Sequence, residues 1–173
     1  LKALDETGVE RVRFATSHPK DLSDEVIAQF GTLRSLMPAL HLPAQSGSDR
    51  ILQRMNRRYT SAHYRQLVSK LPDACPEIAL STDIIVGFPG ETEKDFMDTA
   101  RLVDEIGYHQ VFTFIYSKRE GTPAASMEDN TPHDVIQKRF DRLVDIVQAH
   151  AFEKNQLDLG ATIPVLVEGS SKR

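Results

Sequence analysis

Apolar positions along the chain alternate between two spacings. Short runs of aliphatic and β-branched residues predict four strands, at residues 12–15, 39–42, 78–86 and 110–116. Between and after these runs the apolar residues recur every three or four positions, which predicts helices. Because strands and helices alternate, the pattern predicts an α/β fold built from parallel βα units.

Side chains that can cap a helix stand before most of the helical stretches, namely Ser23, Ser48, Thr60 and Thr92. Thr92 with Asp95 three residues later matches a capping box, and Gly107 is typical of a helix end. A last, long helix is predicted to open at Thr131-Pro132, with the proline in its first position, and to close at Gly160.

The third predicted strand ends in three consecutive apolar residues, Ile84, Ile85 and Val86. Uninterrupted apolar runs are typical of strands that are buried on both faces of a parallel sheet. We therefore expect this strand to be buried on both faces.

Polar and glycine residues gather where the predicted strands end. They are Thr16-Ser17-His18, Gln45-Ser46-Gly47-Ser48, Asp83 with Gly87, and Tyr116-Ser117-Lys118-Arg119. The carboxyl ends of parallel strands meet at one rim, where α/β folds place their active sites. Each residue alone has a simpler explanation, such as a turn, a satisfied loop backbone or a core aspartate. Because all four predicted strands end in such residues, the pattern as a whole favours a ligand-binding or catalytic site.

Composition narrows the class of protein. The 173 residues carry a net charge of −4, from 21 basic and 25 acidic residues, which argues against non-specific coating of nucleic acid. Cys75 is the single cysteine and builds neither an internal disulfide nor a thiolate metal site alone. No apolar run approaches the ~20 residues that span a bilayer, and no secretory signal heads the chain. A cytoplasmic enzyme domain without a membrane partner is expected.

Both ends of the chain suggest a piece of a longer protein. The first residue is Leu1, and residues 1–8 are typical of the last turns of a helix that stops at Gly8. At the other end, residues 163–169 are typical of a strand that begins a further unit.

Four sequence blocks resemble the methylthiotransferase family of radical S-adenosylmethionine (SAM) enzymes. They are Arg13-Phe-Ala-Thr-Ser-His-Pro19, His41-Leu-Pro-Ala-Gln-Ser-Gly-Ser-Asp-Arg-Ile-Leu52, Ser81-Thr-Asp-Ile-Ile-Val-Gly-Phe-Pro-Gly-Glu-Thr92 and Tyr116-Ser-Lys-Arg-Glu-Gly-Thr-Pro-Ala-Ala125. The blocks occur in the family's order and spacing and cover nearly the whole chain.

The resemblance implies a partial, TIM-like (β/α)6 barrel, of which this chain holds the last four βα units. Residues 1–160 would form the C-terminal part of the radical SAM core, without its first two strands. The missing first strand would carry a Cys-x-x-x-Cys-x-x-Cys loop for one [4Fe–4S] cluster, and an upstream domain would carry a second cluster. Residues 161–173 would begin a TRAM-like β-barrel that binds tRNA.

The resemblance also assigns roles at the strand ends. Gln45, Arg57 and Asp83 match positions that bind SAM, with Arg57 on the methionine carboxylate and Asp83 on the ribose hydroxyls. Ser17 is a weaker match. Gly87 would let the backbone approach the adenine, and the strand ending at Tyr116 would line the base. Ser46 belongs to the same binding motif. The chain holds no evident general acid or base.

In such enzymes the reduced cluster cleaves SAM to a 5′-deoxyadenosyl radical, which activates the position that receives the methylthio group. The residues of these motifs resemble those of the family branch that acts on isopentenyl-adenosine beside the tRNA anticodon. The implied partners are the anticodon stem-loop of tRNA and an electron donor such as flavodoxin or ferredoxin. The alternatives are methylthiotransferases acting on threonylcarbamoyl-adenosine in tRNA or on a ribosomal protein, and a non-catalytic barrel that binds a SAM-like ligand.

Overall fold

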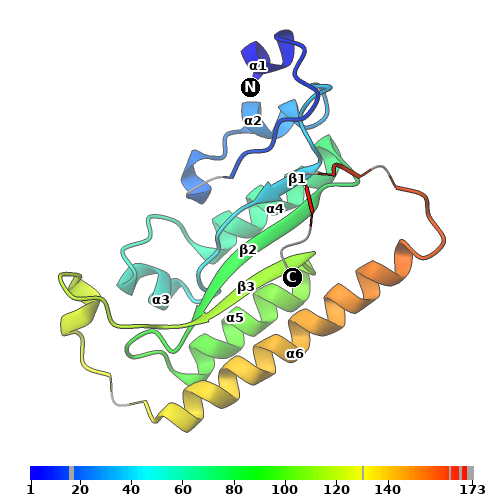
Figure 1. The fold of residues 1–173 in the computed structure, drawn as a ribbon. Helices are drawn as coiled ribbons and strands as arrows, with labels where there is room; N and C mark the ends of the chain where they lie inside the picture. Colours follow the sequence, from blue (N-terminus) through cyan, green and yellow to red (C-terminus); the bar gives the residue numbers. More distant parts are fainter. Residues whose placement is uncertain (16–17, 130, 164, 168, 171–173) are drawn as a thin grey trace.

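The computed structural model describes residues 1–15, 18–129, 131–163, 165–167 and 169–170 of the chain. Its elements, in chain order, are α1 Lys2–Glu6, η1 Pro19–Asp21, α2 Asp24–Gln29, β1 Ala39–His41, α3 Asp49–Arg54, α4 Ser61–Ala74, β2 Ala79–Val86, α5 Glu93–Ile106, β3 Gln110–Ile115, η2 Pro123–Ser126 and α6 His133–Leu157 (Figure 1). The α/β class that the pattern predicts is confirmed.

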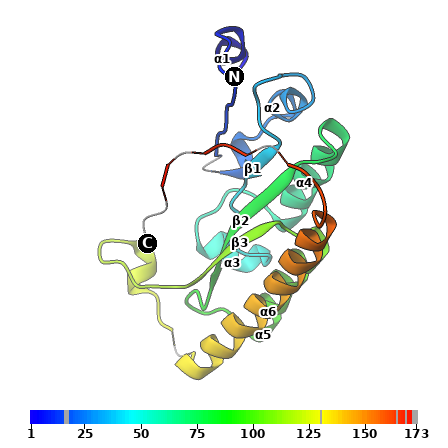
Figure 2. The same cartoon turned by 45° about the vertical axis from the view of Figure 1, so that its right-hand side comes forward.

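The strands β1, β2 and β3 form one parallel sheet in sequence order. Helix α4 lies between β1 and β2 in the chain, and α5 lies between β2 and β3, so each crossover brings the chain back to the end of the sheet where the strands begin. Helices α4, α5 and α6 all lie on one side of the sheet (Figure 2). The other face carries no helix among the described residues, and Figure 1 views the sheet from this open face.

The strand predicted at residues 12–15 is wrong as a continuous element. Val12 forms a parallel bridge with Leu36, and Ala15 forms another with His41. Val12 and Ala15 are three residues apart, whereas their partners Leu36 and His41 are five apart, so no regular ladder joins the two segments. The Ala39 N–H donates to the Met37 carbonyl at 2.7 Å within its own segment and is therefore not bonded to residues 12–15. The described part of the chain thus has three strands, and isolated bridges at Val12 and Ala15 stand in place of the fourth.

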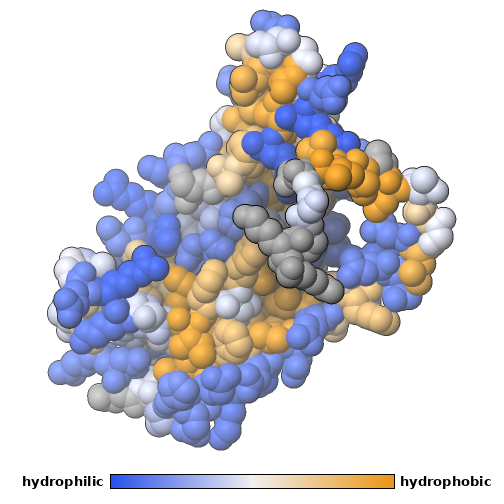
Figure 3. Space-filling model, in the orientation of Figure 1, coloured by the Kyte–Doolittle hydropathy of each residue, from blue (hydrophilic) through white to orange (hydrophobic). Residues whose placement is uncertain are grey.

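Burial alternates along β2, with every second residue packed under the helices. Ile84 and Val86 are fully buried, whereas Ile85 between them is only half-buried. The prediction of burial on both faces is therefore wrong for the part of the chain that the structure describes. The open face instead carries exposed aromatic side chains from β3, Phe112 and Phe114. Figure 3 shows hydrophobic side chains gathered over this part of the sheet.

The helix starts follow the local sequence. The side chains of Ser23, Ser48, Thr60 and Thr92 each accept a hydrogen bond from a backbone N–H of the following turn. The Thr92–Asp95 capping box is present, and Gly107 ends α5 in a left-handed conformation. Helix α6 differs slightly from expectation, because Pro132 is its N-cap residue and not its first helical residue.

Cys75 follows α4 and is a buried free thiol in the hydrophobic core, as expected for a structural cysteine. The residues of the 161–170 segment that the structure describes form no strand, and Ile163, Val165, Leu166 and Val167 are exposed. The strand predicted there has no partner in the described chain, and the TRAM-like unit stays a prediction. Among the described helices, none combines the length and the apolar character that crossing a membrane requires.

Candidate functional site

A pocket of about 500 Å³ lies where β2 and β3 end. Four of the residues to which the resemblance assigns a role in SAM binding line it: Gln45, Arg57, Asp83 and Tyr116. They come from the loop after β1, the turn after α3, the middle of β2 and the end of β3. Its other lining residues are Ile85, Phe114, Ile115, Ser117, Arg119, Thr122 and Ala124. The parallel sheet thus brings together groups that are up to 71 positions apart, counted from Gln45 to Tyr116.

Gln45 is held in an unusual backbone conformation at this pocket. Its φ is +64°, in the left-handed region that costs most L-residues about 1 kcal/mol. Its N–H donates to the carbonyl of Asp83 at 2.8 Å, and its own carbonyl accepts from the N–H of Ile85 at 3.0 Å. These bonds to β2 fix the loop, and the residue as a whole is only 8% exposed. Backbone strain of this kind is typical of functional sites.

Asp83 lies on the open face of the sheet, beside its register partner Phe112. One carboxylate oxygen, Oδ2, lies 3.4 Å from Nε2 of His41, and Nδ1 of His41 lies 3.0 Å from the hydroxyl of Ser81. The contacts of Asp83 are thus with β1 and the open face, and the alternative of a core aspartate bonded to a helix N-terminus is not what the structure shows. His41 is half-buried and hydrogen-bonded, as expected for a histidine within a strand.

Arg57 brings a positive charge to the pocket. It follows the left-handed residue Asn56, and its N–H donates to the carbonyl of Leu52 at 2.8 Å, which ties this turn to α3. Burial lowers the pKa of His18, and the positive charge of Arg57 lowers it further. The rings of His18 and Tyr59 meet edge to face at 5.0 Å. The guanidinium of Arg57 thus stands near the segment that precedes α2 as well as near the pocket.

Tyr116 closes the pocket at the end of β3. Its ring meets that of Phe88 edge to face at 5.0 Å, and its N–H donates to the carbonyl of Val86 at 2.8 Å. The hydroxyl oxygen is buried and has no hydrogen-bond partner among the described residues. Buried tyrosine hydroxyls usually find a partner, so this one marks a place where a ligand group can bind.

Ser46 and Gly87 lie outside the lining of this pocket. The Ser46 hydroxyl is buried 3.1 Å from the Thr99 hydroxyl of α5. Gly87 has φ +72°, and a Cβ there would come within 2.6 Å of the Ile136 side chain of α6. Both residues therefore hold strand-end loops against helices. Ser17 falls outside the described residues.

A buried ion pair anchors the loop after β2. Glu91 accepts from the N–H of Gly87 at 3.0 Å and lies 3.4 Å from the guanidinium of Arg139 in α6, and both side chains are almost completely buried. Burial raises the pKa of Glu91 to about 7, while the Gly87 N–H and the Arg139 charge oppose that rise. Arg139 also donates to the Glu91 carbonyl at 3.0 Å. Sequence reasoning missed this pair, because only the packing of α6 brings its members together.

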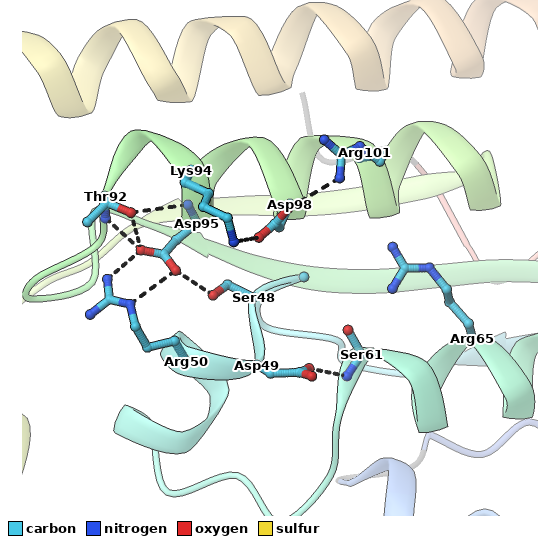
Figure 4. A pocket seen from close by; sticks show the side chains of 11 residues that line it. Ser48, Asp49, Arg50, Ser61, Arg65, Thr92, Lys94, Asp95, Asp98 and Arg101 are labelled. Atoms are coloured by element: carbon cyan, nitrogen blue, oxygen red, sulfur yellow. Dashed lines mark hydrogen bonds and ion pairs between the residues drawn. The ribbon is translucent and has the colours of Figure 1, made fainter.

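A second pocket, between α3, α4 and α5, is rich in charged groups (Figure 4). Asp95 is its centre and accepts from the Ser48 hydroxyl at 2.6 Å, the Thr92 N–H at 2.9 Å and the guanidinium of Arg50. Burial acts to raise the pKa of Asp95, but the hydrogen bonds from Arg50, Ser48 and Thr92 outweigh it and hold that pKa well below its usual value. Of the remaining cations, Lys94 and Arg101 pair with Asp98 within α5, and Arg65 pairs with Glu105. The bonds of Asp95 to Ser48 and Arg50 hold the loop after β1 against α5.

Sequence reasoning also missed Thr122 and Ala124 as pocket-lining residues. They belong to the turn around η2, which the Gly-Thr-Pro run after the last strand signals as a loop but not as a pocket wall.

Comparison with known proteins also points to radical SAM enzymes. A family model described as the radical SAM superfamily matches residues 1–103. The chain is 55% identical over 165 residues to the tRNA-2-methylthio-N(6)-dimethylallyladenosine synthase of Clostridium botulinum (strain Langeland / NCTC 10281 / Type F), covering 95% of this chain. It is 53% identical over 166 residues to the synthase of the same name from Caldicellulosiruptor saccharolyticus, covering 96% of this chain. The chain spans only 37% and 35% of the length of these two relatives.

Among solved structures, the fold is similar to that of coproporphyrinogen III oxidase from Escherichia coli, which is described as a radical SAM enzyme. The TM-score is 0.55 at 18% sequence identity, and the match covers 80% of this chain and 31% of that one. At this identity the similarity concerns the fold alone.

Proposed function

Because this chain belongs to the radical SAM superfamily, we propose that its strand-end pocket binds S-adenosylmethionine within a larger tRNA methylthiotransferase. The reaction would add a methylthio group to C2 of N6-isopentenyl-adenosine next to the anticodon. The observation that carries this proposal is the 55% identity, over 95% of the chain, to a protein named for that product. The whole protein would work on the tRNA anticodon stem-loop with an electron donor such as flavodoxin or ferredoxin.

The chemistry of the pocket fits SAM. The methionine end of SAM is a zwitterion, and the guanidinium of Arg57 is suited to its carboxylate. The ribose carries hydroxyls, to which the Asp83 carboxylate can act as acceptor. Gln45 offers both a donor and an acceptor, and the unpartnered Tyr116 hydroxyl offers another polar contact. Phe114 and Ile85 give the pocket the apolar surface that an adenine ring needs.

The two [4Fe–4S] clusters belong to other parts of the proposed protein. The described residues hold no group of three or more His, Cys, Asp or Glu side chains that is suited to a metal ion. Cys75, the single cysteine of the sequence, is buried in the core. When bound, the clusters supply the electron for radical chemistry and the sulfur. Residues of this chain would bind and orient SAM and exclude water.

Domain assignment follows from the same proposal. Residues 1–160 would complete a barrel whose first strands lie upstream, and residues 161–173 would lead into a TRAM-like tRNA-binding unit. Ile163, Val165, Leu166 and Val167 are exposed apolar residues, as expected for a strand that pairs only within a further unit.

The decisive experiment is mass spectrometry of tRNA nucleosides from cells with and without the full-length gene. We expect 2-methylthio-isopentenyl-adenosine to disappear on deletion, and its precursor without the methylthio group to accumulate. Complementation with an Asp83→Ala variant should leave the precursor in place, whereas Asp98→Ala should restore the product. An unchanged nucleoside profile would contradict the proposal and direct attention to threonylcarbamoyl-adenosine, to a ribosomal protein or to a non-catalytic binding barrel.

A further inference from the structure

Polar and aromatic side chains from three strands form a row across the open face of the sheet. In register, His41 of β1 stands beside Ser81 of β2, and Asp83 of β2 stands beside Phe112 of β3. The His41 ring meets the Phe112 ring edge to face at 5.9 Å. His41 is therefore confined between Ser81, Asp83 and Phe112, and only Asp83 of these residues lines the strand-end pocket.

The contact with Asp83 sets the hydrogen position on one nitrogen of the imidazole. A carboxylate only accepts hydrogen bonds, so the Nε2 atom that faces Asp83 Oδ2 at 3.4 Å carries a hydrogen. The other ring nitrogen, Nδ1, lies 3.0 Å from the Ser81 hydroxyl, within hydrogen-bond distance. Ser81, His41 and Asp83 thus form a chain of polar contacts that ends on Oδ2 of Asp83. A contact from a residue that does not itself touch the ligand can fix the orientation of a ligand-binding group.

We propose that His41 is a positioning residue that holds Oδ2 of Asp83, so that Oδ1 is turned to the ribose hydroxyls of bound SAM. This inference rests on the proposed function and deepens it. No hydrogen bond from another described residue reaches Oδ1, so that oxygen is free for a ligand within the part of the chain that the structure shows. His41 itself is outside the pocket lining and acts through Asp83.

A contribution to folding stability does not explain why His41 and Asp83 lie together on this face. The side chains of His41 and Asp83 are 27% and 28% exposed, and partly exposed ion pairs contribute at most about 1 kcal/mol to folding. An apolar residue facing Phe112 would pack at least as well on this face. The polar row therefore fits a binding role better than a structural one.

The test uses the full-length protein with its clusters and measures affinity by anaerobic calorimetry. The ligands are S-adenosylhomocysteine and its 2′,3′-dideoxy analogue, which lacks both ribose hydroxyls. The variants are His41→Phe, His41→Gln, Asp83→Ala and the double variant His41→Phe/Asp83→Ala. Far-UV circular dichroism and cluster absorbance confirm that each variant is folded. His41→Gln keeps an N–H donor and guards against a packing artefact in His41→Phe.

We expect His41→Phe to weaken S-adenosylhomocysteine binding about five- to tenfold, the effect of losing one polar contact of ordinary strength, with little effect on the dideoxy analogue. His41→Gln should recover most of the loss. In the Asp83→Ala background, His41→Phe should add nothing, because its effect passes through the carboxylate.

Two kinds of result would overturn the inference, and they are distinguishable. If Asp83→Ala loses the preference for the ribose hydroxyls while His41→Phe keeps it, or weakens both ligands equally, His41 is not a positioning residue and the proposed function stands. If Asp83→Ala also keeps the wild-type preference, Asp83 does not bind the ribose, and that part of the proposed function fails together with the inference.

Discussion

Gln45 combines a strained backbone with a side chain in the pocket. Only Gln45 and Asn56 among the described non-glycine residues have a positive φ. Asparagine tolerates this conformation far better than glutamine does. A glycine at position 45 would adopt the same backbone without strain, yet the sequence has a residue with an amide that can donate and accept. Such a choice indicates that the side chain serves binding at the expense of stability.

We predict that Gln45→Gly changes the free energy of unfolding by less than about 1 kcal/mol, because relief of strain offsets the added entropy of glycine. SAM affinity of the full-length protein should fall about tenfold or more, because the amide is lost. Asn56→Gly is the matched control, since it also removes a positive-φ side chain, outside the pocket lining. Urea unfolding and calorimetry measure the two effects. A stable variant with wild-type SAM affinity would remove Gln45 from the site.

Among elements, α5 is the support for the loop that carries Gln45. Gly47 comes so close to α5 that an added Cβ would lie 2.7 Å from the Thr99 Cα. Its N–H donates to the Thr99 hydroxyl at 2.9 Å. The Asp95 carboxylate at the start of the same helix holds Ser48. One helix therefore fixes three consecutive loop residues, Ser46 to Ser48, and through them the position of Gln45.

Asp95→Asn should lower the free energy of unfolding by about 2 kcal/mol at neutral pH, because the buried carboxylate loses its charge-assisted hydrogen bonds from Ser48, Thr92 and the half-exposed Arg50. The folded-state pKa of Asp95 is depressed, so its contribution is present above the unfolded-state value of 3.8 and is lost as pH falls below it. The stability gap between wild type and variant should narrow in acid. Asp98→Asn, which breaks only exposed pairs, should cost under about 1 kcal/mol. A gap that is constant down to low pH would contradict the role of the charge.

The contact of α6 with the loop after β2 should have the opposite pH dependence. Burial raises the pKa of Glu91 from 4.5 to about 7, so the folded state keeps a proton that the unfolded state loses. The free energy of unfolding should therefore fall by about 3 kcal/mol as pH rises between these values, and level off above them. Glu91→Gln should remove this slope while retaining an acceptor for the Gly87 N–H. Urea unfolding across that pH range measures it; stability that rises with pH would mean that Arg139 outweighs burial.

Local signals predict elements better than long-range signals do. The caps at Ser23, Ser48, Thr60 and Thr92 each depend on a backbone N–H three residues away, and each helix begins where its cap predicts. The strand at residues 12–15 depends on a distant partner, and the unequal spacing of its two bridges, at Leu36 and His41, leaves no continuous ladder. Sequence alone does not contain that register.

The same distinction holds for the site. Gln45, Asp83 and Tyr116 share a pocket because parallel strands place their ends together, which topology predicts. Ser46 and Gly87 stand in the same motifs, but their places are decided by how tightly α5 and α6 pack on the loops. A motif identifies a segment, while the direction of each side chain depends on the packed fold.

On the scale of the whole molecule, the sheet has one covered and one open face. Helices α4 to α6 lie against one face, whereas Phe112 and Phe114 are 42% and 51% exposed on the other. Clustered exposed aromatic residues of this kind mark a surface that another segment or a ligand covers. The pocket residues stand on this open face, so the full site would need the strands that we propose lie upstream.

A single buried thiol limits what this chain can do alone. A [4Fe–4S] cluster needs about four ligands, usually thiolates, whereas the sequence has only Cys75, with 7% of its surface exposed. Anaerobic reconstitution of the 173-residue chain with iron and sulfide should therefore give no cluster absorbance and no bound iron after gel filtration. The full-length protein, treated in parallel, should take up iron and turn brown, and a Cys75→Ser variant of it should do so equally. Iron bound in stoichiometric amounts by the short chain would contradict the proposal that all cluster ligands lie elsewhere, since its own side chains would then have to hold the metal.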